Sequence, residues 1–103
     1  MTKDDKLRVS FCRMGDKIID FSIQLSSKID GKWKEILRID TETHGDKNNE
    51  GFAHVHHFYA KRSQWYQSLP GAQNKNFNLL YKQWLRDAIN RAKYHKRNYL
   101  FNK

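Results

Sequence analysis

The chain has 103 residues, which suffices for one domain but not for a full dinucleotide-binding domain or a barrel of eight βα units. Aromatic residues make up 14% of it, a content that favours a folded chain over a disordered one. The net charge is +9, the longest apolar runs have three residues, and the N-terminus lacks the apolar core of a secretion signal. These features predict a single cytoplasmic domain without a membrane-spanning helix.

Three segments in the first half of the chain alternate apolar and polar residues with the period of two that is typical of half-buried strands. They cover residues 7–12, 17–27 and 33–41. The short segments between them, Met14-Gly15-Asp16 and 29–32, indicate hairpin turns. An antiparallel arrangement of these strands is therefore expected.

The turn between the second and third strands determines which side chains share a face. A two-residue turn at Asp30-Gly31 would pair Ile23 with Arg38 and mix apolar and charged residues on one face. A three-residue loop with a bulge shifts the pairing by one residue, so that Ile23 shares a face with Leu37. Because register follows the buried face, the sequence favours the three-residue loop.

A fourth strand is expected after a polar loop. Residues 42–52 are polar, and residues 53–59 resume the period of two. His57 then belongs to the core face, whereas His54 and His56 point to the opposite, open face of the sheet.

From residue 74 to residue 98 the apolar period becomes helical. The predicted fold is α+β: a four-stranded antiparallel meander over residues 7–59 with one long C-terminal helix, 74–98, packed on one face. The whole chain, 1–103, then forms a single domain. Residues 61–72 are expected to be irregular or a short extra helix.

The positive charge is concentrated in the second part of the chain. Residues 1–60 contain ten Lys and Arg and ten Asp and Glu, whereas residues 61–103 contain ten basic residues and one acid. This asymmetry indicates a polyanionic partner such as RNA, with an acidic protein or solubility alone as the alternatives. Five cations form one stripe opposite the apolar side of the predicted helix and are candidate nucleic-acid contacts: Lys75, Lys82, Arg86, Lys93 and Arg97.

Four further side chains carry expectations about packing. Cys12 lies in an apolar stretch, which predicts a small buried side chain. Phe58 lies near basic residues, where a nucleic-acid base could stack. Arg91 and His95 fall on the apolar side of the predicted helix, so Arg91 has to reach either an acidic partner at the sheet edge or solvent.

Five residues form a candidate catalytic site: Arg38, Asp40, His44, His54 and His56. The period of two puts Arg38 and Asp40 on one side of their strand, and likewise His54 and His56 on theirs. A pair of histidines supplies a general base and a general acid, arginine stabilises a phosphorane, and a carboxylate orients an imidazole. Cleavage of RNA by its own 2′-hydroxyl needs only these groups, so no metal or other cofactor is expected.

The run Arg38-Ile39-Asp40, followed by His44-Gly45 and His54-Val55-His56-His57, resembles the Arg-x-Asp…His…His-x-His pattern of TumE-type toxins of prokaryotic toxin–antitoxin systems. The resemblance covers roughly residues 17–60. In place of the Pro-His-His of that family, this chain has Thr43-His44-Gly45. It also resembles related small proteins of unknown role that have the same Arg-x-Asp…His-Gly…His pattern. The resemblance implies an RNA-cleaving toxin that is held inactive by an antitoxin protein.

Other functions fit the same residues. His54 and His56, with His44 or Asp40, have the donor types of a zinc or nickel site. Arg38 and Asp40 can also form a simple surface ion pair, worth about 0–1 kcal/mol. The chain would then be a non-enzymatic nucleic-acid-binding protein or a protein-interaction module with an acidic partner. The exposed edges of a four-stranded meander, strands 1 and 4, also suit a homodimer.

Overall fold

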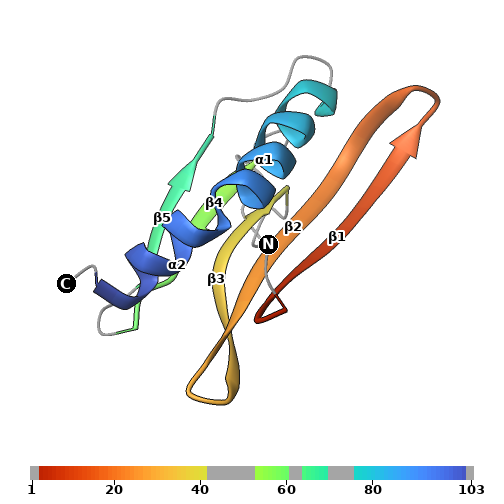
Figure 1. The fold of residues 1–103 in the computed structure, drawn as a ribbon. Coiled ribbons are helices and arrows are strands. Elements are labelled where there is room, and N and C mark those ends of the chain that lie inside the picture. Colours follow the sequence, from red (N-terminus) through yellow and green to blue (C-terminus); the bar gives the residue numbers. More distant parts are fainter. Residues whose placement is uncertain (1–2, 42–52, 61–63, 70–75, 102–103) are drawn as a thin grey trace.

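The structure is a computed structural model, and it describes residues 3–41, 53–60, 64–69 and 76–101. One antiparallel sheet runs in the order β1-β2-β3-β4-β5, and two helices lie across one of its faces (Figure 1). We call the covered side the helix face and the other side the pocket face. The elements are β1 (Asp5–Met14), β2 (Lys17–Ile29), β3 (Lys32–Asp40), β4 (His54–His57), β5 (Trp65–Ser68), α1 (Asn78–Asn90) and α2 (Ala92–Phe101).

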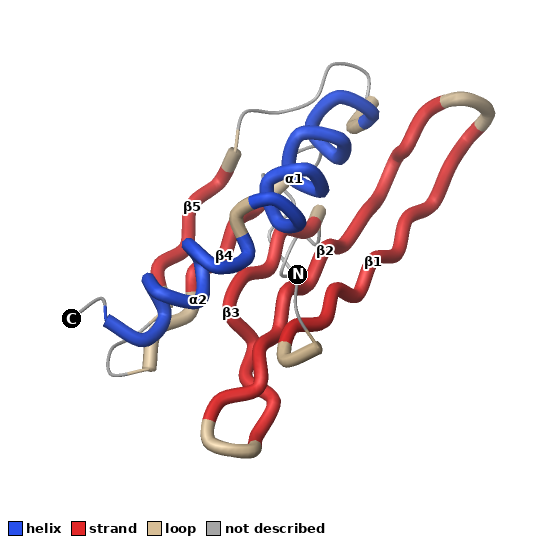
Figure 2. Tube along the Cα trace, viewed as in Figure 1, coloured by secondary structure: helices blue, strands red, loops and turns tan. Residues whose placement is uncertain are grey.

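The α+β class and the order of the four predicted antiparallel strands are confirmed, but two details differ. Within the segment 61–72, where no strand was expected, β5 pairs with β4, with His57 opposite Trp65. The single long helix is wrong, because α1 and α2 are separate helices (Figure 2). Arg91 leaves the helical conformation between them, with φ −115° and ψ 21°. The apolar period continues across this break, and no Gly or Pro marks it in the sequence.

The hairpin between β2 and β3 has the expected register but a different turn. Ile29 pairs with Lys32 across a two-residue turn, in which Asp30 and Gly31 have φ values of +53° and +79°. Positive φ at both central positions is the property of a type I′ turn, so the expected three-residue loop is wrong. The register shift occurs further along, where Ile36 is the extra residue. This bulge places Ile23 opposite Ile39.

A second bulge aligns the first hairpin with the helices. Between Cys12 and Arg13 the pairing shifts, and Ile18 becomes a buried residue. Its backbone amide donates to Asn78 Oδ1 at 2.7 Å, and its carbonyl oxygen accepts from the Phe77 amide at 2.9 Å. These bonds hold the N-terminus of α1 against β2.

The core lies between the helix face and the two helices. Ile23, Leu25, Leu37 and Ile39 have no exposed surface, and Phe77 covers them from the start of α1. The aromatic rings of Phe21 and Phe77 meet edge to face, with centroids 5.8 Å apart. Burial of these alternate residues turns the residues between them toward the pocket face.

Cys12, which was expected in the interior, lies at the surface, and so does Trp33. Cys12 is exposed, because β1 is an edge strand and Cys12 pairs with Asp20 on the pocket face. Trp33 is 43% exposed, since the bulge at Ile36 turns it away from Leu37. Among the described helices, none has the length and apolar character required to cross a bilayer.

The turn geometry gives a stability prediction. Replacing Gly31 by Ala should lower the free energy of unfolding by about 1–2 kcal/mol, because a Cβ at φ +79° is strained even though no atom lies within 4 Å of it. Urea unfolding followed by circular dichroism measures this. The neighbouring exposed variant Lys32→Ala is the control and should change stability by less than about 0.5 kcal/mol. Equal stabilities of the two variants would contradict the turn assignment.

Candidate functional site

The strand register brings four of the five predicted catalytic residues together. Arg38 lies directly opposite His56, and Asp40 lies directly opposite His54, on paired positions of β3 and β4. All four belong to the pocket face, because the residues between them, Ile39 and Val55, are core residues on the helix face. The fifth, His44, lies outside the described residues.

This part of the pocket face is not open, which corrects the expectation for the two histidines. His54 has no exposed surface, and His56 and Asp40 retain 5% and 4%. Both histidines lie on an inner strand, because β5 extends the sheet beyond β4. Arg38 is the exception, with a side chain that is 28% exposed.

The imidazole of His56 is fixed by contacts on several sides. Its Nδ1 lies 3.0 Å from Gln64 Oε1. Its Nε2 then faces Asp40, with Oδ1 at 4.0 Å. The ring of Phe58 stacks on the imidazole, with centroids 6.2 Å apart and planes 12° from parallel. The contacts with Gln64 and Phe58 therefore fix the ring with Nε2 on the side of the Asp40 carboxylate.

Arg38 is held by a carboxylate that the sequence pattern does not single out. Its Nε and Nη2 donate to the two carboxylate oxygens of Glu35 at 2.7 and 2.8 Å. Residues three apart on a regular strand point to opposite faces. The bulge at Ile36 instead places Glu35 and Arg38 on the same face. The guanidinium also lies 5.7 Å from the ring centroid of Phe58. Arg38 thus forms a bidentate pair with Glu35, a partner that the sequence pattern does not indicate.

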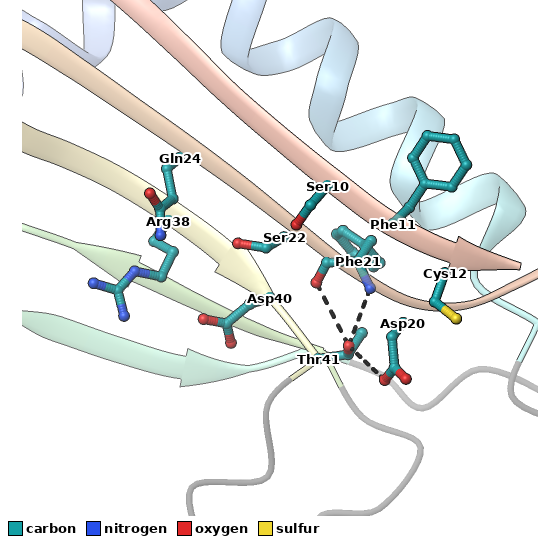
Figure 3. Close-up of a pocket in the computed structure, with 10 residues that line it drawn as sticks. All are labelled: Ser10, Phe11, Cys12, Asp20, Phe21, Ser22, Gln24, Arg38, Asp40 and Thr41. Atoms are coloured by element: carbon teal, nitrogen blue, oxygen red, sulfur yellow. Dashed lines mark hydrogen bonds between the residues drawn. The ribbon is translucent and has the colours of Figure 1, made fainter.

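A pocket of about 600 Å³ lies on the pocket face beside these residues (Figure 3). Arg38 and Asp40 line it, whereas neither His54 nor His56 belongs to its lining. At its rim, Thr41 Oγ1 donates to Asp20 Oδ1 at 3.0 Å. The lining comes from β1, β2, β3 and the residue that follows β3: Ser10, Phe11, Cys12, Asp20, Phe21, Ser22, Gln24, Arg38, Asp40 and Thr41.

The predicted basic stripe lies on the other side of the molecule. Lys82 and Arg86 on α1, and Lys93 and Arg97 on α2, are all exposed. Because α1 and α2 cover the helix face, the sheet separates these cations from Arg38 and Asp40 (Figure 1). Lys75 lies outside the described residues. The structure therefore does not bring the stripe and the candidate catalytic residues onto one surface.

Three titratable side chains meet where α2 packs on the sheet. His95 is 5% exposed, and its Nε2 lies 2.7 Å from Asp87 Oδ2. The ring of His57 lies 6.3 Å from His95 and 5.2 Å from Trp65, centroid to centroid. Burial, and to a lesser extent the nearby His95, lower the pKa of His57, while Asp87 acts in the opposite direction. Arg91 pairs with Asp87 at 3.3 Å and is exposed, so it does not reach the candidate site.

The described residues contain no group of three or more His, Cys, Asp or Glu side chains arranged to hold a metal ion. The alternative of a zinc or nickel site at His54 and His56 therefore gains no further ligand from this part of the chain. Its remaining predicted donor, His44, lies in the segment that is not described.

Comparison with known proteins identifies one family. The family model described as "Domain of unknown function (DUF7718)" matches residues 1–102. No curated protein and no solved structure shows significant similarity to the chain.

The environment of His57 gives a pH prediction. Its pKa in the folded chain lies below the ordinary value of 6.5, so the unfolded chain binds more protons as the pH falls through this region. The contribution of His57 is therefore complete above pH 6.5 and declines below it. The free energy of unfolding should fall between about pH 7.5 and about pH 5.5, and should fall less in His57→Gln. Urea titrations at the two pH values measure this, and equal losses in both proteins would contradict the assignment.

Proposed function

The chain belongs to the family described as a domain of unknown function, DUF7718, and from its geometry we propose that it is a toxin-like protein that cleaves RNA without a metal. One observation carries the proposal. Arg38 and Asp40 line the same pocket, and each lies opposite a histidine of β4. Attack by a 2′-hydroxyl on phosphorus requires a cation that binds the phosphate and a base that takes the proton. Arg38 supplies the cation, and Asp40, with an imidazole behind it, supplies the base.

Arg38 binds the phosphate. It is the partly exposed member of the group, and its planar guanidinium matches two phosphate oxygens. Glu35 fixes the orientation of the guanidinium before a substrate arrives. Such preorganisation favours stabilisation of the charge that develops on the phosphorane.

Asp40, rather than a histidine, is the group that meets the substrate. It lines the pocket, whereas His56 lies behind it with Nε2 4.0 Å from Oδ1. The roles that the sequence pattern suggests for the two side chains are thus exchanged: Asp40 is the base, and His56 is its positioning partner. His54 remains a buried neighbour of Asp40 without access to the pocket.

The reaction follows from these positions. Asp40 takes the proton of the 2′-hydroxyl, and the 2′-oxygen forms a bond to phosphorus while Arg38 neutralises the equatorial oxygens. The bond from phosphorus to the 5′-oxygen then breaks, and that oxygen takes a proton from water in the pocket. The products are a 2′,3′-cyclic phosphate and a 5′-hydroxyl, and Asp40 returns its proton to solvent.

Replacing Asp40 by Asn tests this assignment, because Asn keeps the shape but cannot take the proton. The rate of RNA cleavage should fall about 100-fold or more, and Arg38→Gln should cause a similar loss. End-labelled RNA incubated with purified protein in excess EDTA measures the rate and identifies the cyclic phosphate.

The matched control is Asp20→Asn, which changes another carboxylate that lines the same pocket. It should retain the wild-type rate, and circular dichroism should show that all three variants are folded. Cleavage by Asp40→Asn at the wild-type rate, or no cleavage of any RNA by the wild-type protein, would refute the proposal. The toxin role further predicts that expression slows growth and that an antitoxin protein relieves this effect.

A second candidate, nucleic-acid binding without cleavage, is favoured by the outer surface of the helices. Lys93 and Arg97 line a hollow of about 530 Å³ on α2 together with Tyr94 and Phe101. These two aromatic residues are 48% and 72% exposed. Cations interleaved with exposed rings suit the phosphates and bases of a single strand.

Replacing Lys82, Arg86, Lys93 and Arg97 together by Gln tests this second function. RNA binding should weaken, and the slope of log K against log salt should become shallower by about 0.7 for each phosphate that a cation no longer neutralises. Fluorescence anisotropy at several salt concentrations measures both. Replacement of four other exposed cations, Lys17, Lys28, Lys32 and Lys34, is the matched control with the same charge change. Equal losses of affinity in the two variants would mean that net charge, not this surface, binds RNA.

A further inference from the structure

The outer edge of β1 is long, carries exposed apolar side chains and is unpaired by any other strand of the described sheet. β1 is the first strand in the sheet order and has ten residues. Every residue from Arg8 to Met14 is exposed, including Val9 at 36% and Phe11 at 52%. An edge of this kind presents free backbone hydrogen-bonding groups and is a ready site for strand addition.

We propose that a second copy of this chain pairs its β1 with this edge, antiparallel and centred on Val9, and that Arg8 of the partner subunit completes the pocket. The pairing itself is independent of the proposed function, whereas the role of Arg8 rests on it.

The sequence of β1 is complementary to itself in this register. A two-fold axis perpendicular to the sheet keeps the faces of both copies aligned, so each residue meets a partner on the same face. With the axis at Val9, the valines of the two copies meet, Leu7 meets Phe11, and Asp5 meets Arg13. Apolar residues thus contact apolar residues, and the charged pair at each end has opposite signs. Ser27 Oγ, which donates to Asp5 Oδ1 at 2.6 Å, already fixes the carboxylate.

The neighbouring registers are worse by the same criteria. An axis at Arg8 would place two arginines directly opposite each other and Asp5 against Phe11. An axis at Ser10 would place Leu7 against Arg13. Directly opposed like charges destabilise a strand pair, and burying an unpaired charge against an apolar side chain costs more.

The same register brings a cation to the pocket. Ser10 and Cys12 line the pocket from β1, so the pocket reaches the edge of the sheet (Figure 3). With the axis at Val9, Arg8 of the partner subunit lies opposite Ser10 on the pocket face, one strand spacing of about 4.8 Å away. Two guanidinium groups, Arg38 and the partner subunit's Arg8, then face one pocket from opposite sides. This arrangement suits an oligonucleotide with successive phosphates.

A cysteine at the axis tests the register without any substrate. In a Cys12→Ser background, Val9→Cys should form a disulfide-linked dimer under mild oxidation, because directly opposed Cα atoms lie about 4.5–5.5 Å apart, within the range that a disulfide spans. Gln67→Cys in the same background is the matched control on β5, the other edge strand, and should not cross-link. Failure of Val9→Cys to cross-link, or equal cross-linking of both variants, overturns the proposed pairing.

Light scattering during gel filtration tests the association itself. The wild-type mass should be twice the 12.4 kDa of one chain. Val9→Lys should halve it, because two lysines would be directly opposed. Circular dichroism shows whether this variant is folded. A wild-type monomer, or a folded Val9→Lys dimer, overturns the proposal.

Mixing two variants tests the shared pocket. Arg8→Ala should stay dimeric and cleave RNA about tenfold or more slowly. Asp40→Asn should be inactive, but a mixture of the two should regain activity, because one pocket of the mixed dimer has both Asp40 and Arg8. No gain on mixing, with mixed dimers shown by mass, refutes the role of Arg8. If the wild-type protein cleaves no RNA, the proposed function fails, while the cross-linking result still decides the pairing.

Discussion

The register between β2 and β3 is the constraint on which the candidate site depends. Burial of Ile23, Leu25, Leu37 and Ile39 under the helices fixes this register, because a shift by one residue would expose the whole apolar set. Because these residues point to the helix face, the residues between them in the chain form the pocket face. Arg38 faces the pocket because its two neighbours in the chain are buried on the other side of the sheet.

The bulge at Ile36 allows a two-residue turn to be combined with this register. A type I′ turn at Asp30-Gly31 alone would put charged and apolar side chains on one face. One extra residue in β3 corrects the mismatch within the strand, and it also brings Glu35 beside Arg38. A feature that the core requires therefore also sets the geometry of the most accessible cation in the site.

The sheet divides the chemistry of the molecule into two surfaces. On the pocket face, Arg38 and Asp40 line a pocket and His56 lies behind Asp40. On the outer side of the helices, cations and aromatic rings are exposed without contact with that pocket. A ligand that engages both surfaces would have to pass around an edge of the sheet. Because of this separation, the proposed cleavage at the pocket and the proposed binding at the helices depend on different residues.

The α+β class, the order of the first four strands and the placement of Arg38, Asp40, His54 and His56 on one face of the sheet follow from the sequence pattern. A period of two is a local property, and burial of one face enforces it along the whole strand. Tertiary structure alone decided the break at Arg91, the fifth strand, the burial of His54 and the contacts of Glu35 and Gln64. These features depend on a bulge, on a break without Gly or Pro, or on a strand added beside β4. Packing between segments that are distant in the chain determines each of them, and no local pattern of residues in the sequence indicates it.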